Sequence, residues 1–250
     1  MSVYRYPARV LAHRGGGSIA PENTLAGLRE AGRRGYAGVE FDVMLARDDV
    51  PVLMHDDTLE RTTDGGGAVP QMHAADLARL DAGRWLGERF AGEPVPQLAQ
   101  AAGLCQSLNL FANVEIKPYA PGGDSVARQT GQIVAAQSAQ LWHGAEARVL
   151  LSSFAEAALA AALAAAPALA RACLFDAVPA DWELRLGRLA CVALHCNARK
   201  LDAQFARAVK DAGLALMCWT VNDTREAARL FDWGVDAICT DRLDLFEHVK

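Results

Sequence analysis

Short apolar runs alternate with segments rich in alanine, leucine and arginine along the 250 residues of this chain, and most of the runs end in a polar residue. Runs that are apolar throughout are typical of parallel strands covered on both faces. The alternation therefore predicts parallel strands joined by helices. Nine runs are predicted as strands: Arg9–His13, Gly38–Leu45, Pro51–His55, Leu110–Lys117, Arg148–Ser153, Ala172–Asp176, Cys191–Asn197, Leu214–Asn222 and Val235–Asp241.

The spacing of the strand ends sets the fold class. Eight ends are counted, and six of the seven intervals between them, 20 to 37 residues long, each hold one strand and one helix. Eight parallel strands in about 250 residues close a (β/α)8 TIM barrel, so one barrel domain over residues 1–250 is predicted. An open doubly wound sheet is the alternative, because periodicity alone does not establish closure. The eight ends are His13, Glu40, Glu115, Ser152, Phe175, His195, Trp219 and Thr240.

The interval from Glu40 to Glu115 is the exception, at 75 residues. It holds the run Pro51–His55 and a stretch rich in glycine, aspartate and threonine. We predict a small insertion there, over approximately residues 56–96, between the second and third barrel strands. Helix starts are also predicted: Ser18, Asn23 or Thr24 as the cap of the first helix, and Thr224 as the residue that opens the helix after Asn222.

Charge and composition exclude some classes of function. Lysine plus arginine number 25 against 30 aspartates and glutamates, a net charge of −5 that argues against nucleic-acid binding. The N-terminal residues lack an apolar export signal, and the longest apolar stretch is too short to span a bilayer. We therefore expect a cytoplasmic protein without stable membrane association, either monomer or homodimer. Six cysteines without a C-x-x-C pair are expected to be reduced and buried.

Two predicted strands carry acidic residues at alternate positions. Residues i and i+2 of a strand point to one face, so Glu40 pairs with Asp42, and Glu115 with Lys117. Carboxylates inside an apolar strand are costly to bury unless they are paired or bind a metal. Three of them form an all-oxygen set suited to Mg²⁺ or Ca²⁺. The alternative is an ion-pair network in which Lys117 and Arg14 neutralise the acids.

Two histidines stand at strand ends. His13 is followed by Arg14 and three glycines, which would let the backbone approach a ligand while the guanidinium binds an oxyanion. His55 ends the run from Pro51. Such a pair suits acid/base chemistry, in which one group takes a proton and the other gives one. A flexible turn with one surface cation, and histidines that serve only as structural hydrogen-bonding groups, are the alternatives.

At this point the sequence resembles the glycerophosphodiester phosphodiesterase family, and the matching motifs span nearly the whole chain. The motifs are His13-Arg14-Gly15, Pro21-Glu22-Asn23-Thr24, Glu40-Phe41-Asp42-Val43, Val52-Leu53-Met54-His55-Asp56, Leu59-Glu60-Arg61-Thr62-Thr63, Val114-Glu115-Ile116-Lys117, Leu151-Ser152-Ser153-Phe154, Trp219-Thr220-Val221-Asn222 and Thr240-Asp241-Arg242. The resemblance implies a TIM barrel that hydrolyses glycerophosphodiesters to sn-glycerol 3-phosphate and an alcohol with a divalent cation. It implies that His13 and His55 are the acid/base pair. It also implies that Glu40, Asp42 and Glu115 bind the metal, with Arg14 and Lys117 near the phosphate.

The residues agree with that chemistry, because phosphodiester cleavage requires fixed positive charge around phosphorus and proton transfer at its oxygens. Trp219 would give an apolar wall to the substrate, or would be a core residue. Glu22 and Asn23 are interpreted as hydrogen-bonding supports, and Asp56 as a group that orients His55 or begins a turn. The cytoplasmic setting favours Mg²⁺ over Ca²⁺.

The alternative functions are a lysophospholipase D-like phosphodiesterase on lipids and a non-catalytic phosphate-binding barrel. The sequence leaves open the preferred alcohol, the nucleophile, which histidine is the acid, and the oligomeric state.

Overall fold

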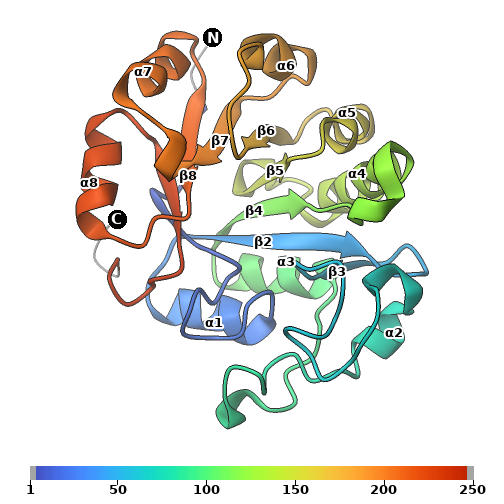
Figure 1. The fold of residues 1–250 in the computed structure, drawn as a ribbon. Helices are drawn as coiled ribbons and strands as arrows, with labels where there is room; N and C mark the ends of the chain where they lie inside the picture. Colours follow the sequence, from blue (N-terminus) through green and yellow to red (C-terminus); the bar gives the residue numbers. More distant parts are fainter. Residues whose placement is uncertain (1–3, 247–250) are drawn as a thin grey trace.

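Eight parallel strands close into a barrel in the computed structural model, which describes residues 4–246 (Figure 1). Closure follows from β1 (Val10–Ala12), which pairs in parallel with both β9 (Ala237–Thr240) and β2 (Gly38–Leu45). The predicted (β/α)8 barrel is therefore confirmed, and the open sheet is excluded. The other barrel strands are β4 (Phe111–Ile116), β5 (Val149–Ser153), β6 (Ala170–Phe175), β7 (Ala193–Asn197) and β8 (Ala215–Trp219).

The ninth predicted strand is present but does not belong to the barrel. β3 (Pro51–Leu53) pairs antiparallel with the far half of β2, where Val43 faces Leu53. The expectation that all nine runs are parallel is wrong for this one. The chain turns back over only a few residues after β2, and a short turn joins antiparallel strands, whereas parallel strands need a long crossover. The return of the chain at residues 96–97 covers the other edge of β3.

Helices surround the barrel (Figure 1). Thr24 caps the first helix, since its hydroxyl accepts a hydrogen bond from the Gly27 N–H, as one of the three predicted alternatives requires. Thr224 begins the helix after Asn222, as predicted, and the Asp223 carboxylate before it accepts from the backbone N–H groups of the first turn. The helices are α1 (Leu25–Arg33), α2 (Ala74–Leu77), α3 (Leu98–Ser107), α4 (Gly123–Leu141), α5 (Glu156–Ala165), α6 (Trp182–Arg188), α7 (Ala203–Asp211) and α8 (Thr224–Asp232).

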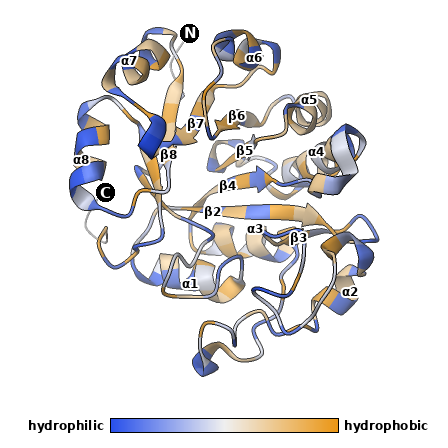
Figure 2. Ribbon diagram, viewed as in Figure 1, coloured by the Kyte–Doolittle hydropathy of each residue, from blue (hydrophilic) through white to orange (hydrophobic). Residues whose placement is uncertain are grey.

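The strands are buried along nearly their whole length, which explains their continuous apolar runs. Outward side chains pack on the helices, and inward ones fill the barrel with a second cluster that includes Leu11, Phe111 and Met217. All six cysteines are free and buried, as expected. Hydrophilic bands interrupt β2 and β4 in Figure 2. In a barrel of this kind, a site is expected where polar residues of neighbouring strands face the carboxyl-terminal mouth.

The chain between β3 and α3 makes an excursion between the second and third barrel strands (Figure 1). It contains two short 3₁₀ helices (Val69–Gln71 and Glu88–Phe90) and α2 around an apolar cluster of its own. The limits of the insertion, residues 56–96, and the single domain of residues 1–250 stay predictions. Residues 1–3 and 247–250 lie outside the described part of the chain. Between residues 4 and 246, no helix has the length and apolar character needed to cross a bilayer.

Candidate active site

Three carboxylates meet at the carboxyl-terminal mouth of the barrel. β2 and β4 are neighbours, and their register sets Asp42 beside Glu115 and Glu40 beside Asn113. All four side chains therefore point into the barrel. One oxygen from each of Glu40, Asp42 and Glu115 lies within 4.8 Å of the others, and all three residues are buried. The alternation of side chains along each strand, predicted from sequence, thus brings the three acids together.

The electrostatics of this acid cluster fit a divalent cation. Burial, then the Asp42 charge, raise the pKa of Glu40 to about 7. Burial and Asp42 also raise the pKa of Glu115 well above its usual range. A positive charge beside these carboxyl groups would favour their ionised forms. An all-oxygen donor set suits Mg²⁺ or Ca²⁺, so the residues present fit such an ion.

Ion pairs reach the same acids, as the alternative interpretation requires. Lys117 Nζ lies 3.7 Å from Asp42 and 4.0 Å from Glu115, and Arg14 Nε lies 3.7 Å from Asp42. Burial acts to raise the pKa of Asp42, but Lys117 and the other facing cations lower it below its usual value. The pairs therefore keep the pKa of Asp42 low, whereas the pKa values of Glu40 and Glu115 stay raised in spite of their own polar contacts. Ion pairing alone does not account for the cluster.

Asn23 holds Asp42 from the turn before α1. Its amide donates to Asp42 Oδ2 at 2.9 Å, and the Asp42 N–H donates back to Asn23 Oδ1 at 3.0 Å. Asn23 has a φ of +55°, a left-handed conformation that asparagine tolerates better than most residues. The Thr24 cap fixes the turn, so the sequence that starts α1 also positions a carboxylate of the acid cluster. The predicted supporting role of Asn23 is confirmed by these hydrogen bonds.

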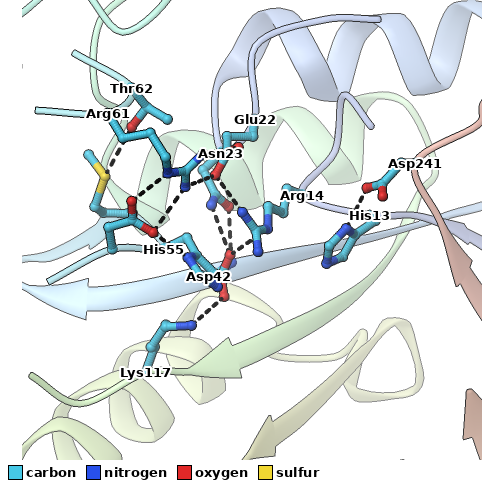
Figure 3. A network of polar contacts seen from close by, with 12 residues as sticks. His13, Arg14, Glu22, Asn23, Asp42, His55, Arg61, Thr62, Lys117 and Asp241 are labelled. Atoms are coloured by element: carbon cyan, nitrogen blue, oxygen red, sulfur yellow. Dashed lines mark hydrogen bonds and ion pairs between the residues drawn. The ribbon is translucent and has the colours of Figure 1, made fainter. Parts of the chain in front are cut away.

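Figure 3 shows contacts from the Arg14 side chain to Glu22 and Asp42, and the Arg14 backbone reaches the acid cluster as well. Its N–H donates to Glu40 Oε2 at 2.9 Å, and its guanidinium donates to Glu22 at 2.7 Å. Arg61 from the excursion also binds Glu22, through two hydrogen bonds of 2.8 Å. Glu22 thus supports Arg14, as predicted. Arg61 belongs to a motif quoted for the family resemblance, yet nothing in the sequence assigned it a role.

The three glycines after Arg14 do not act as predicted. A Cβ on Gly16 would lie 2.3 Å from the Ala20 carbonyl oxygen, and one on Gly17 would lie 2.4 Å from that of Asp241. The glycines therefore let the chain pack on itself, and they do not line the cavity at the mouth. We expected these glycines to lie close to a ligand, but the residues after β9 fill the space beside their turn.

His13 is oriented by a residue from the other end of the chain. Its Nδ1–H donates to Asp241 Oδ1 at 2.6 Å, and its Nε2 lies 3.9 Å from Glu40. Asn222 holds Asp241 by donating to its second oxygen at 3.0 Å. Burial acts to lower the pKa of His13, but Asp241 and Glu40 together raise it above the usual value. Sequence reasoning gave Asp241 no role, since 228 residues separate it from His13.

His55 reaches the mouth because β3 folds back along β2. The Met54 N–H donates to the Asp42 carbonyl, which sets the next residue beside the acid cluster. His55 Nδ1–H donates to Asp56 at 2.6 Å, which confirms that Asp56 orients the imidazole. Burial lowers the pKa of His55, in the opposite direction to that of His13. The two histidines thus differ in the protonation state that their surroundings favour.

Trp219 lies at the end of β8 and packs edge-on against Phe154, with ring centroids 5.6 Å apart. Both rings line a cavity of about 200 Å³ at the mouth. All eight residues singled out from sequence line this cavity: His13, Arg14, Glu40, Asp42, His55, Glu115, Lys117 and Trp219. Residues that were not singled out are Asp241 and Arg61 behind it and Asn113 in its wall. The geometry unites cations, carboxylates and two oriented imidazoles around one small space.

Comparisons with known proteins point to one family. The sequence profile of the Glycerophosphoryl diester phosphodiesterase family matches residues 13–245. A glycerophosphodiester phosphodiesterase of Caldanaerobacter subterraneus subsp. tengcongensis is 33% identical over 93% of each chain. One from Bacillus subtilis is 30% identical over 98% of this chain and 87% of its own.

Solved structures agree with the sequence comparisons. A phosphodiesterase of Oleispira antarctica, determined in complex with the product sn-glycerol-3-phosphate, superposes with a TM-score of 0.85 at 37% identity. The match covers 93% of this chain and 92% of that one. A glycerophosphodiester phosphodiesterase from Agrobacterium tumefaciens superposes with a TM-score of 0.79 at 26% identity, over 97% of this chain and all of its own.

Proposed function

Because this chain belongs to the glycerophosphodiester phosphodiesterase family of phosphoric diester hydrolases, we propose that it hydrolyses glycerophosphodiesters to sn-glycerol 3-phosphate and an alcohol at the barrel mouth. One observation carries the proposal. Three buried carboxylates from β2 and β4 lie within 4.8 Å of one another, in the same cavity as two oriented histidines. Phosphodiester cleavage uses each of these groups: a cation and fixed positive charge for the phosphoryl oxygens, and two groups that transfer protons.

Glu40, Asp42 and Glu115 would hold one divalent cation, with Mg²⁺ favoured and Ca²⁺ possible. When bound, the cation would draw negative charge from the phosphoryl oxygens. Asn23 keeps one carboxylate of this set in place through its reciprocal hydrogen bonds. Such outer partners matter because a ligand that rotates away costs affinity.

Arg14 and Lys117 bind the phosphate in this proposal. Both side chains are only partly exposed and both approach Asp42, so they lie on the rim of the acid cluster. The charge on a phosphodiester increases over its equatorial oxygens in the transition state, and fixed cations stabilise it there. The hydrogen bonds from Arg14 and Arg61 to Glu22 hold the guanidinium of Arg14 ready before substrate arrives.

The two histidines transfer the proton. We assign His55 as the base, since burial favours its neutral form, and His13 as the acid, since Asp241 and Glu40 favour its protonated form. Environments that push two pKa values apart mark such a division of roles. As the nucleophile oxygen bonds to phosphorus, its proton passes to His55. The bond from phosphorus to the alcohol oxygen breaks, and that oxygen takes a proton from His13.

The glycerol of the substrate lies against Trp219 in this arrangement, with the phosphate between Lys117 and Arg14. A hydroxyl of that glycerol is the nucleophile that the family resemblance favours, through a cyclic phosphate that water then opens. The cytoplasmic location and the state of monomer or homodimer stay predictions from sequence.

A phosphodiesterase assay on glycerophosphocholine tests the proposal, with EDTA and then Mg²⁺ or Ca²⁺ added back, in the wild type and Glu40→Ala. We expect turnover that EDTA abolishes, that a divalent cation restores, and that the variant lacks. Turnover that persists in EDTA would contradict the ligand assignment. Lysophosphatidylcholine run in parallel tests the lipid alternative. Inactivity on every glycerophosphodiester with saturating cation would favour a phosphate-binding barrel.

A further inference from the structure

A second cavity opens directly from the candidate active site. It has a volume of about 350 Å³ and lies between the end of β4, the start of α4 and the residues that follow β5. The two cavities share Glu115, Lys117 and Phe154. A ligand held at Lys117 therefore has access to both. We call the second cavity the side groove.

The walls of the side groove are largely apolar. They include Ile116, Pro118, Tyr119, Ala120, Ala127, Phe154 and Ala155. Phe154 is 47% exposed, so part of its ring is open to a ligand. Its ring meets Trp219 in the active-site cavity and also lines the side groove, so it separates the two chambers.

The polar side chains of the side groove are those of Glu115, Lys117, Tyr119, Asp124 and Ser153. The Ser153 hydroxyl already donates to the Ile116 carbonyl at 2.6 Å and accepts from the Ala155 N–H. The Asp124 carboxylate is exposed and lies 3.8 Å from Arg128. Lys117 and the amino-terminal end of α4 add positive charge at the same edge. Glu115 also lines the groove, but in the proposed function it would hold the cation, and Asp124 lies beside Arg128. Neither carboxylate is therefore left free to select a cationic alcohol.

We infer that the side groove is the subsite for the departing alcohol. It selects the alcohol by its apolar surface and not by its charge. When Lys117 binds the phosphate of the diester, the glycerol extends toward Trp219. The departing alcohol extends toward Tyr119 and Phe154. The preferred alcohols are those with exposed methyl or methylene groups. Esters of polyols are expected to have a lower kcat/KM. This inference rests on the proposed function, because it assigns the second arm of the same substrate.

A series of synthetic esters tests it: glycerophosphate joined to methanol, propanol and hexanol. We expect kcat/KM to rise about twofold to fourfold per methylene, as partial to full burial of each group implies. A second pair compares glycerophosphocholine with its neutral isostere, the ester of 3,3-dimethylbutanol. We expect the two esters to be hydrolysed within tenfold of each other, because the alcohols have the same shape and differ only in the charge and in its modest effect on leaving ability.

Two variants locate the effect. Phe154→Ala removes the shared wall and is expected to lower the increase per methylene by half or more, whatever it does to the methyl ester. Ala120→Asp adds a carboxylate at an exposed position of the groove and is expected to shift preference toward the choline ester. Leu184→Ala is the matched control, because it removes a large exposed side chain from α6 and should change neither measure.

The outcomes separate the two proposals. Hydrolysis of the methyl ester with no increase along the series would overturn the groove assignment and leave the activity intact. A preference of tenfold or more for the choline ester over its isostere would also overturn it, since the groove would then select for positive charge. Failure to hydrolyse any ester in the presence of cation would instead count against the proposed function.

Discussion

Replacing Glu115 with glutamine removes one buried charge while keeping the shape of the side chain. In the protein without cation, Glu115 faces two carboxylates whose oxygens lie within 4.8 Å and one ammonium group at 4.0 Å. At an effective dielectric of about 20, each repulsion is about 3.5 kcal/mol and the attraction about 4 kcal/mol. The balance is unfavourable by about 3 kcal/mol, so Glu115→Gln is expected to stabilise the metal-free protein by about that amount.

The sign of the pH dependence follows from the pKa of Glu115, which burial and then Asp42 raise above its usual value. A carboxyl group of this kind contributes stability at low pH and loses it as the pH rises above the ordinary carboxyl pKa. The gain from Glu115→Gln should therefore be larger at pH 7.5 than at pH 4.5. For a chain of this size, about 3 kcal/mol corresponds to roughly 6–12 °C in melting temperature.

Function should change in the opposite direction. Without one ligand, the variant should lose the rise in melting temperature that Mg²⁺ gives the wild type, and kcat should fall by about 100-fold or more. Thermal melts in EDTA and in Mg²⁺, with Glu183→Gln on the exposed face of α6 as control, measure these changes. A variant that melts below the wild type in EDTA, or that keeps the full response to Mg²⁺, would refute the reasoning.

Three further outcomes are expected. Asp56→Asn weakens the hydrogen bond that orients His55 and should lower kcat about 10-fold to 100-fold with KM nearly unchanged, by steady-state kinetics. Asn23→Ala should weaken Mg²⁺ binding about 10-fold to 100-fold by calorimetry, because Asp42 loses both of its hydrogen bonds to that side chain. Burial lowers the pKa of His195 to about 3, so it stays neutral in the folded protein and stability falls as the pH drops below about 6.5. His195→Gln should remove about 2 kcal/mol of the loss between pH 7.5 and pH 5, and an unchanged pH dependence in urea unfolding would contradict this.

The acid cluster could be predicted from sequence because strand geometry is local. Alternate residues of a strand share a face, so Glu40 and Asp42 had to point the same way, whatever the rest of the chain did. The spacing of strands and helices likewise fixed the number of strand ends. Parallel strands in one barrel present their carboxyl ends at one mouth, which brings Glu115 to the same place.

Other features depend on which strands become neighbours. The pairing of β1 with both β2 and β9 closes the barrel, and only that closure brings Asp241 to His13 across 228 residues. The antiparallel return of β3 sets His55 beside Asp42, and the excursion then supplies Arg61 to Glu22. No local period encodes these contacts.

The sequence by itself therefore determined the fold class, the acid cluster and the eight residues that line the cavity. The tertiary structure decided which hydrogen bonds hold those residues, what the glycines after Arg14 pack against, and where the side groove lies. The physical reason is range. Side-chain direction along a strand follows from backbone geometry over two residues, whereas the partner of an imidazole or a guanidinium is chosen only when distant segments pack together.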